Sequence, residues 1–140
     1  MRTSRPGGLE VILDTNALSA FFDGEPAVVE ILSKAAAVHL PVIVIGEYRY
    51  GLRASRLRKH REPKLEAFTR VCTVLPILES TTTSYAAVRH ELRRSGKPIP
   101  ENDVWISALA LEYGLPVLSD DRHFDAVRNV KRVTWSVDPS

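Results

Sequence analysis

The chain has 140 residues, close to the commonest size of a single domain, so one hydrophobic core is expected. Apolar residues make up 44% and charged residues 26% of the chain, an ordinary globular composition that argues against a fibrous or disordered protein. A net charge of +2 is too small to indicate nucleic-acid binding by itself, and a single cysteine excludes an internal disulfide and a thiolate metal site.

The two ends of the chain are expected to lie outside the folded domain. Residues 1–8 are polar, contain Pro6-Gly7-Gly8 and lack the hydrophobic stretch of a signal peptide, so they predict a flexible leader. No apolar run reaches the roughly 18 residues that a membrane helix needs. We therefore expect one domain over residues 9–136, a short tail over 137–140 and, from the single cysteine, a reducing cytoplasmic compartment.

In the first half of the chain, apolar runs typical of buried strands alternate with stretches of helical period. The predicted elements are a strand over residues 9–13, a helix capped by residues 14–16 and ending before Asp23–Pro26, a helix over 27–36, a strand over 38–45, and a long basic stretch after Gly46 that predicts two helices with a break near Pro63.

The same alternation continues in the second half. The predicted elements are a strand over residues 71–78, helices over 81–94 and 102–113, a short strand over 116–119, a turn and short helix over 120–127, and a last strand over 130–135. Because Pro76 cannot donate to a sheet, the strand that contains it is expected at an edge or to end early. The alternation predicts an α/β fold with a central, mostly parallel sheet of four or five strands and crossover helices.

Acidic side chains follow three of the predicted strands. Asp14 directly follows the first strand, Glu47 comes two residues after the run that ends at Ile45, and Asp120 and Asp121 follow residues 117–119. In open parallel sheets, ligands bind beyond the carboxyl ends of the strands, so these side chains are expected at one site.

A fourth acid, Asp103, lies in the first turn of its predicted helix, where the helix dipole favours a negative charge. Taken singly, each of these acids is more often a helix cap than a ligand. Carboxylates gathered in one cleft raise one another's pKa values, and this energetic cost persists only where a cation or a function offsets it. Together, the acids predict a site for Mg²⁺ or Mn²⁺, since both ions prefer oxygen ligands and suit phosphodiester hydrolysis. Whether one or two ions bind stays open.

Four segments of the chain form an ordered set of motifs. They are VILDTN at residues 11–16, IGEYRYG at 45–51, PIPENDVWISA at 98–108 and LSDDRHF at 118–124. Each motif alone occurs by chance in many proteins. The order and spacing of the set resemble those of the PIN domain family over residues 9–135, and in particular the toxin ribonucleases of VapBC-type toxin–antitoxin pairs.

This resemblance implies a three-layer α/β/α fold and assigns roles to individual residues. The implied catalytic and metal-holding acids are Asp14, Glu47, Asp103 and Asp121, supported by Asn16 and Ser119. The choice of Asp121 over Asp120 rests on spacing and is open by one residue. Ser119 is expected to orient water or phosphate, or to satisfy the strand-end backbone, and Asn16 to support the site or to bond its own backbone.

Two other motif residues stand out. Ser107 occupies a position where the family usually has alanine, a change in packing more than in chemistry. His123 follows the acidic pair, but the family does not need a histidine there, so no catalytic role is assigned to it.

The resemblance further implies a metal-dependent endoribonuclease, a homodimer, and an antitoxin that inserts a side chain, often basic, into the acidic cleft. Arg53, Arg56 and Lys59 belong to a locally basic stretch that is expected to contact RNA, although a solvated helix face explains such a stretch equally well.

Other functions remain open at this point. They are a catalytically inactive RNA- or protein-binding module of the same fold, an RNA-processing or DNA nuclease outside toxin–antitoxin systems, and a phosphoryl-accepting receiver-like domain. The receiver-like domain is disfavoured because Asp14 stands alone after its strand and Lys131 precedes the final strand.

Overall fold

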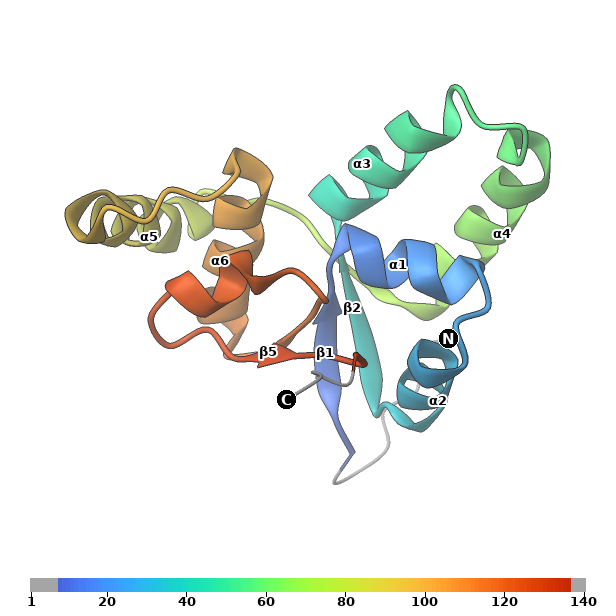
Figure 1. Ribbon diagram of the computed structural model, residues 1–140, viewed down its shortest axis with the longest axis horizontal. Helices are drawn as coiled ribbons and strands as arrows, with labels where there is room; N and C mark the ends of the chain where they lie inside the picture. The colour runs from blue at the N-terminus through green and yellow to red at the C-terminus, as the bar shows by residue number, and fades with distance from the viewer. Residues whose placement is uncertain (1–7, 137–140) are drawn as a thin grey trace.

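The computed structural model describes residues 8–136 and contains one five-stranded sheet (Figure 1). The strands are β1 Glu10–Leu13, β2 Ala37–Pro41, β3 Thr73–Leu75, β4 Val117–Leu118 and β5 Arg132–Val133. Their order is β3-β2-β1-β4-β5, and every neighbouring pair is parallel. The predicted tail and all of the predicted leader except Gly8 lie outside the described residues.

Helices cover both faces of the sheet. They are α1 Thr15–Phe22, α2 Pro26–Lys34, α3 Val42–Leu52, α4 Arg58–Val71, α5 Thr81–Ser95 and α6 Glu101–Tyr113, with a short 3₁₀ helix, η1, over Arg122–Ala126. In Figure 1, α1 to α4 lie to the right of the sheet and α5 and α6 to the left. Right-handed crossovers explain this division, because the chain moves outward from β1 to β3 and then returns to the other side of β1. The three-layer α/β/α prediction is confirmed.

The core lies on both sides of β1. Val11, Ile12 and Leu13 are all completely buried, as expected for a strand that helices cover on each face. A smaller cluster of Val88, Leu92 and other apolar residues packs α5 against α6 on the outer side of that layer. Within the described residues, no helix is both long and apolar enough to cross a membrane.

The structure corrects the second predicted strand. β2 ends at Pro41, and Val42–Ile45 form the first turn of α3, so the strand prediction for residues 42–45 is wrong. Their β-branched side chains favour strands only weakly, and tertiary packing overrides that preference. Val44 is buried in the core while Val42 is exposed, which gives α3 one face toward the sheet.

Two boundaries in the following segment also differ from the prediction. Pro63 lies inside α4, and the break between the two helices falls at residues 53–57 instead. Val71 ends α4, so β3 is shorter than the predicted strand and stops before Pro76. β3 is an edge strand, which agrees with the expectation for that proline.

Candidate metal centre

The predicted acids meet at the carboxyl edge of the sheet. Strand order reverses between β1 and β4, because the chain leaves β1 toward β2 and later returns on the other side, and such switch points are where open sheets bind ligands. A cleft of about 500 Å³ opens there. Its lining includes Asp14, Glu47, Asp103 and Asp121, carried by four separate segments of the chain.

Asp14 lies at the base of this site and is only 5% exposed. It is the N-cap of α1, so its Oδ1 accepts a hydrogen bond from the Thr15 backbone N–H at 2.8 Å. Its Oδ2 accepts one from the Ser119 hydroxyl at 2.7 Å. Burial raises the pKa of Asp14 to about 6 despite these bonds, and the nearby carboxylates of Asp103 and Glu47 raise it further.

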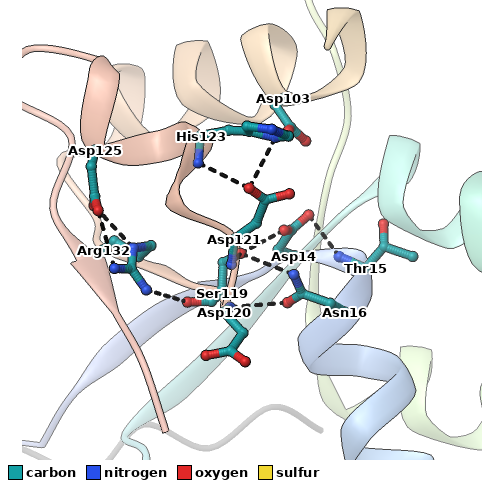
Figure 2. A network of polar contacts seen from close by, with 10 residues as sticks. All are labelled: Asp14, Thr15, Asn16, Asp103, Ser119, Asp120, Asp121, His123, Asp125 and Arg132. Carbon is teal, nitrogen blue, oxygen red and sulfur yellow. Dashed lines mark hydrogen bonds and ion pairs between the residues drawn. The ribbon is translucent and has the colours of Figure 1, made fainter. Parts of the chain in front are cut away.

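Ser119 and Asn16 join the end of β4 to the start of α1 (Figure 2). While donating to Asp14, the Ser119 Oγ accepts from Asn16 Nδ2 at 3.3 Å and from the Asp121 backbone N–H at 2.9 Å. Asn16 Oδ1 in turn accepts from the Asp120 backbone N–H at 3.2 Å. Ser119 therefore satisfies strand-end backbone, as one of the two expectations for it has it, and it also contacts the buried carboxylate of Asp14. A role in orienting water or phosphate stays a prediction.

The two adjacent acids after β4 point in different directions. Asp121 lines the cleft and caps η1, its Oδ1 accepting from the His123 backbone N–H at 2.9 Å. Asp120 points away from the cleft (Figure 2), and its Oδ1 accepts a hydrogen bond from the Thr134 hydroxyl at 2.8 Å. Hydrogen bonds from Ser136 and Thr134 lower the pKa of Asp120. Of the two acids, Asp121 is the one that faces the cleft.

His123 lies between two of the acids. Its Nδ1 is 2.9 Å from Asp103 Oδ2 and 2.9 Å from Asp121 Oδ1. Burial raises the pKa of Asp103, and the hydrogen bond from His123 opposes that effect. Sequence reasoning gave this histidine no role, because only the turn of η1 brings its ring back toward α6. One ligand atom from each of Asp103, Asp121 and His123 fits within a 4.8 Å cluster.

Glu47 reaches the cleft from a helix and not from a strand end. It lies in the second turn of α3, so the reason for which it was selected is wrong, although the side chain does line the cleft. The Thr15 hydroxyl donates a hydrogen bond to Glu47 Oε1 at 3.0 Å. Thr15 was not singled out from the sequence, where it reads as a helix-capping residue.

The composition of the cleft fits a hard divalent cation. Within the described part of the chain, no lysine or arginine lines it. Asp103 and Asp121 contact the His123 imidazole, while Glu101, which also lines the cleft, is contacted by the Arg89 guanidinium from outside the lining. The first turns of α1 and α6 also line it, and the positive ends of their dipoles favour negative charge. Oxygen donors in this number are the ligands that Mg²⁺ and Mn²⁺ prefer.

The residues predicted to contact RNA lie elsewhere. Arg53, Arg56 and Lys59 are exposed around the connection between α3 and α4, and none of them lines the cleft. Glu101 does line it, but its carboxylate is held by the Tyr85 hydroxyl and the Arg89 guanidinium. The structure therefore groups the four acids and leaves these three basic residues apart from them.

Comparison with known proteins agrees with this architecture. The PIN domain family model matches residues 11–130. The VapC ribonuclease Y4jK of Sinorhizobium fredii is 31% identical over 121 residues, which cover 79% of this chain and 86% of that protein. VapBC-5 of Mycobacterium tuberculosis, a member of the VapBC family of toxin–antitoxin systems, superposes with a TM-score of 0.71 at 29% identity, over 89% of this chain and 98% of that one.

A second similar structure is VapBC2 of Rickettsia felis, solved bound to a DNA fragment from its promoter. It has a TM-score of 0.80 at 22% identity and covers 91% of this chain and 100% of that one, which supports the fold. The three-layer fold and the acidic cleft at its switch point agree with the match to the PIN domain family. The chain belongs to the PIN domain family, and within it to the VapC ribonucleases.

Proposed function

We propose that this protein is a metal-dependent endoribonuclease that acts as the toxin of a VapBC-type toxin–antitoxin pair. The observation that carries the proposal is the cleft at the β1/β4 switch point, in which carboxylates from four segments face one another with no lysine or arginine in the described lining. The relatives that are named as ribonucleases support the choice of RNA as substrate.

In this proposal Asp14, Glu47, Asp103 and Asp121 hold Mg²⁺ or Mn²⁺, with the His123 nitrogen beside two of them. When bound, such an ion activates water and neutralises charge on the phosphate. The chain's own hydroxyls fix the carboxylates, because Ser119 donates to Asp14 and Thr15 donates to Glu47. The scissile phosphate would enter from the open side of the cleft.

The test compares carboxylate variants in a cleavage assay with total RNA and Mn²⁺, with and without chelator. Asp14→Asn, Asp103→Asn and Asp121→Asn should each abolish cleavage while the folded circular dichroism spectrum is kept. Asp120→Asn is the matched control, because this neighbouring acid points out of the cleft and bonds Thr134. Full cleavage by folded Asp14→Asn and Asp103→Asn variants would refute the assignment.

The proposed partners are an antitoxin and a second copy of the chain. VapBC-5 is described as belonging to a toxin–antitoxin system, and we extend that assembly to this protein. A basic antitoxin side chain would complement the acidic cleft, and the expected setting is the cytoplasm. A short DNA-binding protein encoded beside this chain should co-purify with it, and the mass of the complex from sedimentation should require two copies of the toxin. Separate elution of the two proteins and a monomeric toxin would contradict this assembly.

Arg53, Arg56 and Lys59 are retained as proposed contacts of an RNA strand that extends beyond the cleft. A catalytically inactive binding module of the same fold is the second candidate function. It shares the exposed basic residues but does not need all four acids. The cleavage assay decides between the two, since a binding module would retain RNA without shortening it.

A further inference from the structure

A second cavity lies next to the acidic cleft, between α5, the connection that follows it and the first turn of α6. It has a volume of about 640 Å³ and is lined by Arg89, His90, Leu92, Arg93, Gly96, Pro98, Ile99 and Val104. We refer to it as the α5–α6 groove. Its charged lining is opposite in sign to that of the cleft, because it contains two arginines and no aspartate or glutamate.

The groove and the cleft share one wall. Residues 100–103 line the cleft, while Ile99 and Val104, immediately before and after them, line the groove. Arg89 bridges the two cavities, because it lines the groove while its guanidinium contacts Glu101 of the cleft lining. The same guanidinium donates to the Tyr85 hydroxyl at 3.1 Å and lies 5.8 Å from the centre of that ring, which fixes its position at the boundary.

The rim and the floor of the groove offer different chemistry. Within residues 8–136, the exposed Arg93 guanidinium has no hydrogen-bond or ion-pair partner, so it is available to an anion. The floor is formed by apolar side chains, of which Leu92 and Val104 are only 4% and 2% exposed. A basic rim over an apolar floor suits a chain that carries both phosphates and flat, unstacked bases, which is the form in which single-stranded RNA is bound.

We propose that single-stranded RNA crosses from the acidic cleft into the α5–α6 groove, where Arg93 contacts a phosphate and a base rests on the apolar floor. This inference builds on the proposed ribonuclease function and identifies where the substrate strand flanking the cleavage point lies. An acidic protein segment is the competing occupant. RNA is favoured because residues 99–104 line the groove and the cleft in turn, so the groove adjoins a cleft suited to a metal-bound phosphate.

Binding is measured apart from cleavage, by fluorescence anisotropy of a short labelled single-stranded RNA in chelator over a series of salt concentrations. Each phosphate contact in single-stranded nucleic acid contributes about 0.7 to the slope of log affinity against log salt. Arg93→Gln should lower the slope by about this amount and weaken binding. Lys34→Gln, a charge-matched control on the exposed surface of α2, should leave the slope unchanged.

A cleavage measurement adds an independent readout. With metal present, Arg93→Gln should raise KM while kcat is kept, because the residue contacts RNA away from the reacting phosphate. An unchanged salt slope for Arg93→Gln, or displacement of the RNA by a polyglutamate peptide at equal charge concentration, would overturn the proposal. The ribonuclease assignment fails by a different result, cleavage by Asp14→Asn, which leaves the binding measurement in chelator unaffected.

Discussion

At the scale of single residues, Asp14 couples the stability of the metal-free protein to pH. Its pKa is raised from 3.8 to about 6 in the folded state, mainly because burial disfavours the charged form. Between these two values the folded chain holds a proton that the unfolded chain has lost, so the free energy of unfolding falls as the pH rises through this window. The full effect is on the order of 3 kcal/mol, at 1.36 kcal/mol for each pKa unit.

The expected outcome is that Asp14→Asn is more stable than the natural chain at neutral pH in chelator, and that this advantage shrinks as the pH falls toward about 4. Urea unfolding at several pH values measures the difference between the two proteins. The raised pKa of Asp103 is present in both and largely cancels. A stability difference that is independent of pH would show that Asp14 ionises as freely in the folded state as in the unfolded one.

Ser107 gives a second prediction at this scale. Its hydroxyl is completely buried on α6 and has no hydrogen-bond partner within the described residues. Because a buried unpaired polar group is destabilising, Ser107→Ala should raise the free energy of unfolding by about 1 kcal/mol. Ser119→Ala is the matched control, since that serine is equally buried but fully bonded, and it should be destabilising. Loss of stability in Ser107→Ala would contradict the account.

Some residues of the site could be predicted from the sequence, and others could not. Asp14 and Asp121 could be selected because acids after strands of a parallel sheet share one edge. The contact of His123 with Asp103 and Asp121 could not be predicted, because it depends on the path of η1 and not on the residue's neighbours in sequence. The hydrogen bond from Thr15 to Glu47 could not be predicted either, because it joins two helices that are separate in the sequence.

At the scale of elements, α3 shows that the strand propensity of its residues does not by itself decide the secondary structure. Val42–Ile45 are β-branched, yet they begin a helix, because Val44 packs into the core and Pro41 ends the preceding strand. Periodicity was decisive elsewhere, and the predicted helix over residues 81–94 agrees with α5 to within one residue. The sequence predicts the break between the two helices at Pro63, because a proline is a strong local signal. The actual turn at 53–57 contains no proline or glycine.

Two glycines allow the effect of backbone conformation on stability to be measured without a change in side-chain packing. Gly114 caps α6 with φ of +65°, and Gly51 lies inside α3, yet an added Cβ would meet no atom within 4 Å at either position. Gly114→Ala should therefore lower stability by about 1 kcal/mol, because alanine is strained in the left-handed region. Gly51→Ala should raise it by up to about 1 kcal/mol through helix propensity. Thermal unfolding measures both, and a shift of the same sign in the two variants would refute the explanation.

At the scale of the whole molecule, metal binding at the switch point is coupled to folding, because only the folded chain brings the four acids together. A ligand held only by the folded chain stabilises it by about 2.7 kcal/mol at a concentration of 100 times Kd. Mg²⁺ or Mn²⁺ should therefore raise Tm of the natural chain, and the increase should be lost in Asp103→Asn. NaCl at matched ionic strength is the control for screening. An equal rise of Tm in the variant would place the bound ion elsewhere.

The overall topology was largely predictable, because alternating strands and helices with right-handed crossovers leave few arrangements. The position of the α5–α6 groove was not, since it depends on how the 96–100 connection packs beside α5. Local sequence patterns determine which segments form helices and strands, whereas the position of a cavity depends on how those elements pack against one another.

The spread of the four acids along the chain has a consequence during protein synthesis. Asp14 emerges from the ribosome early, but Asp121 is added only after most of the domain and must then be positioned by the pairing of β4 with β1. A nascent chain, or one truncated by a premature stop codon before this point, cannot assemble the cleft. Under the proposed function, the cell translating this protein meets a competent nuclease only once nearly all of the domain has been made.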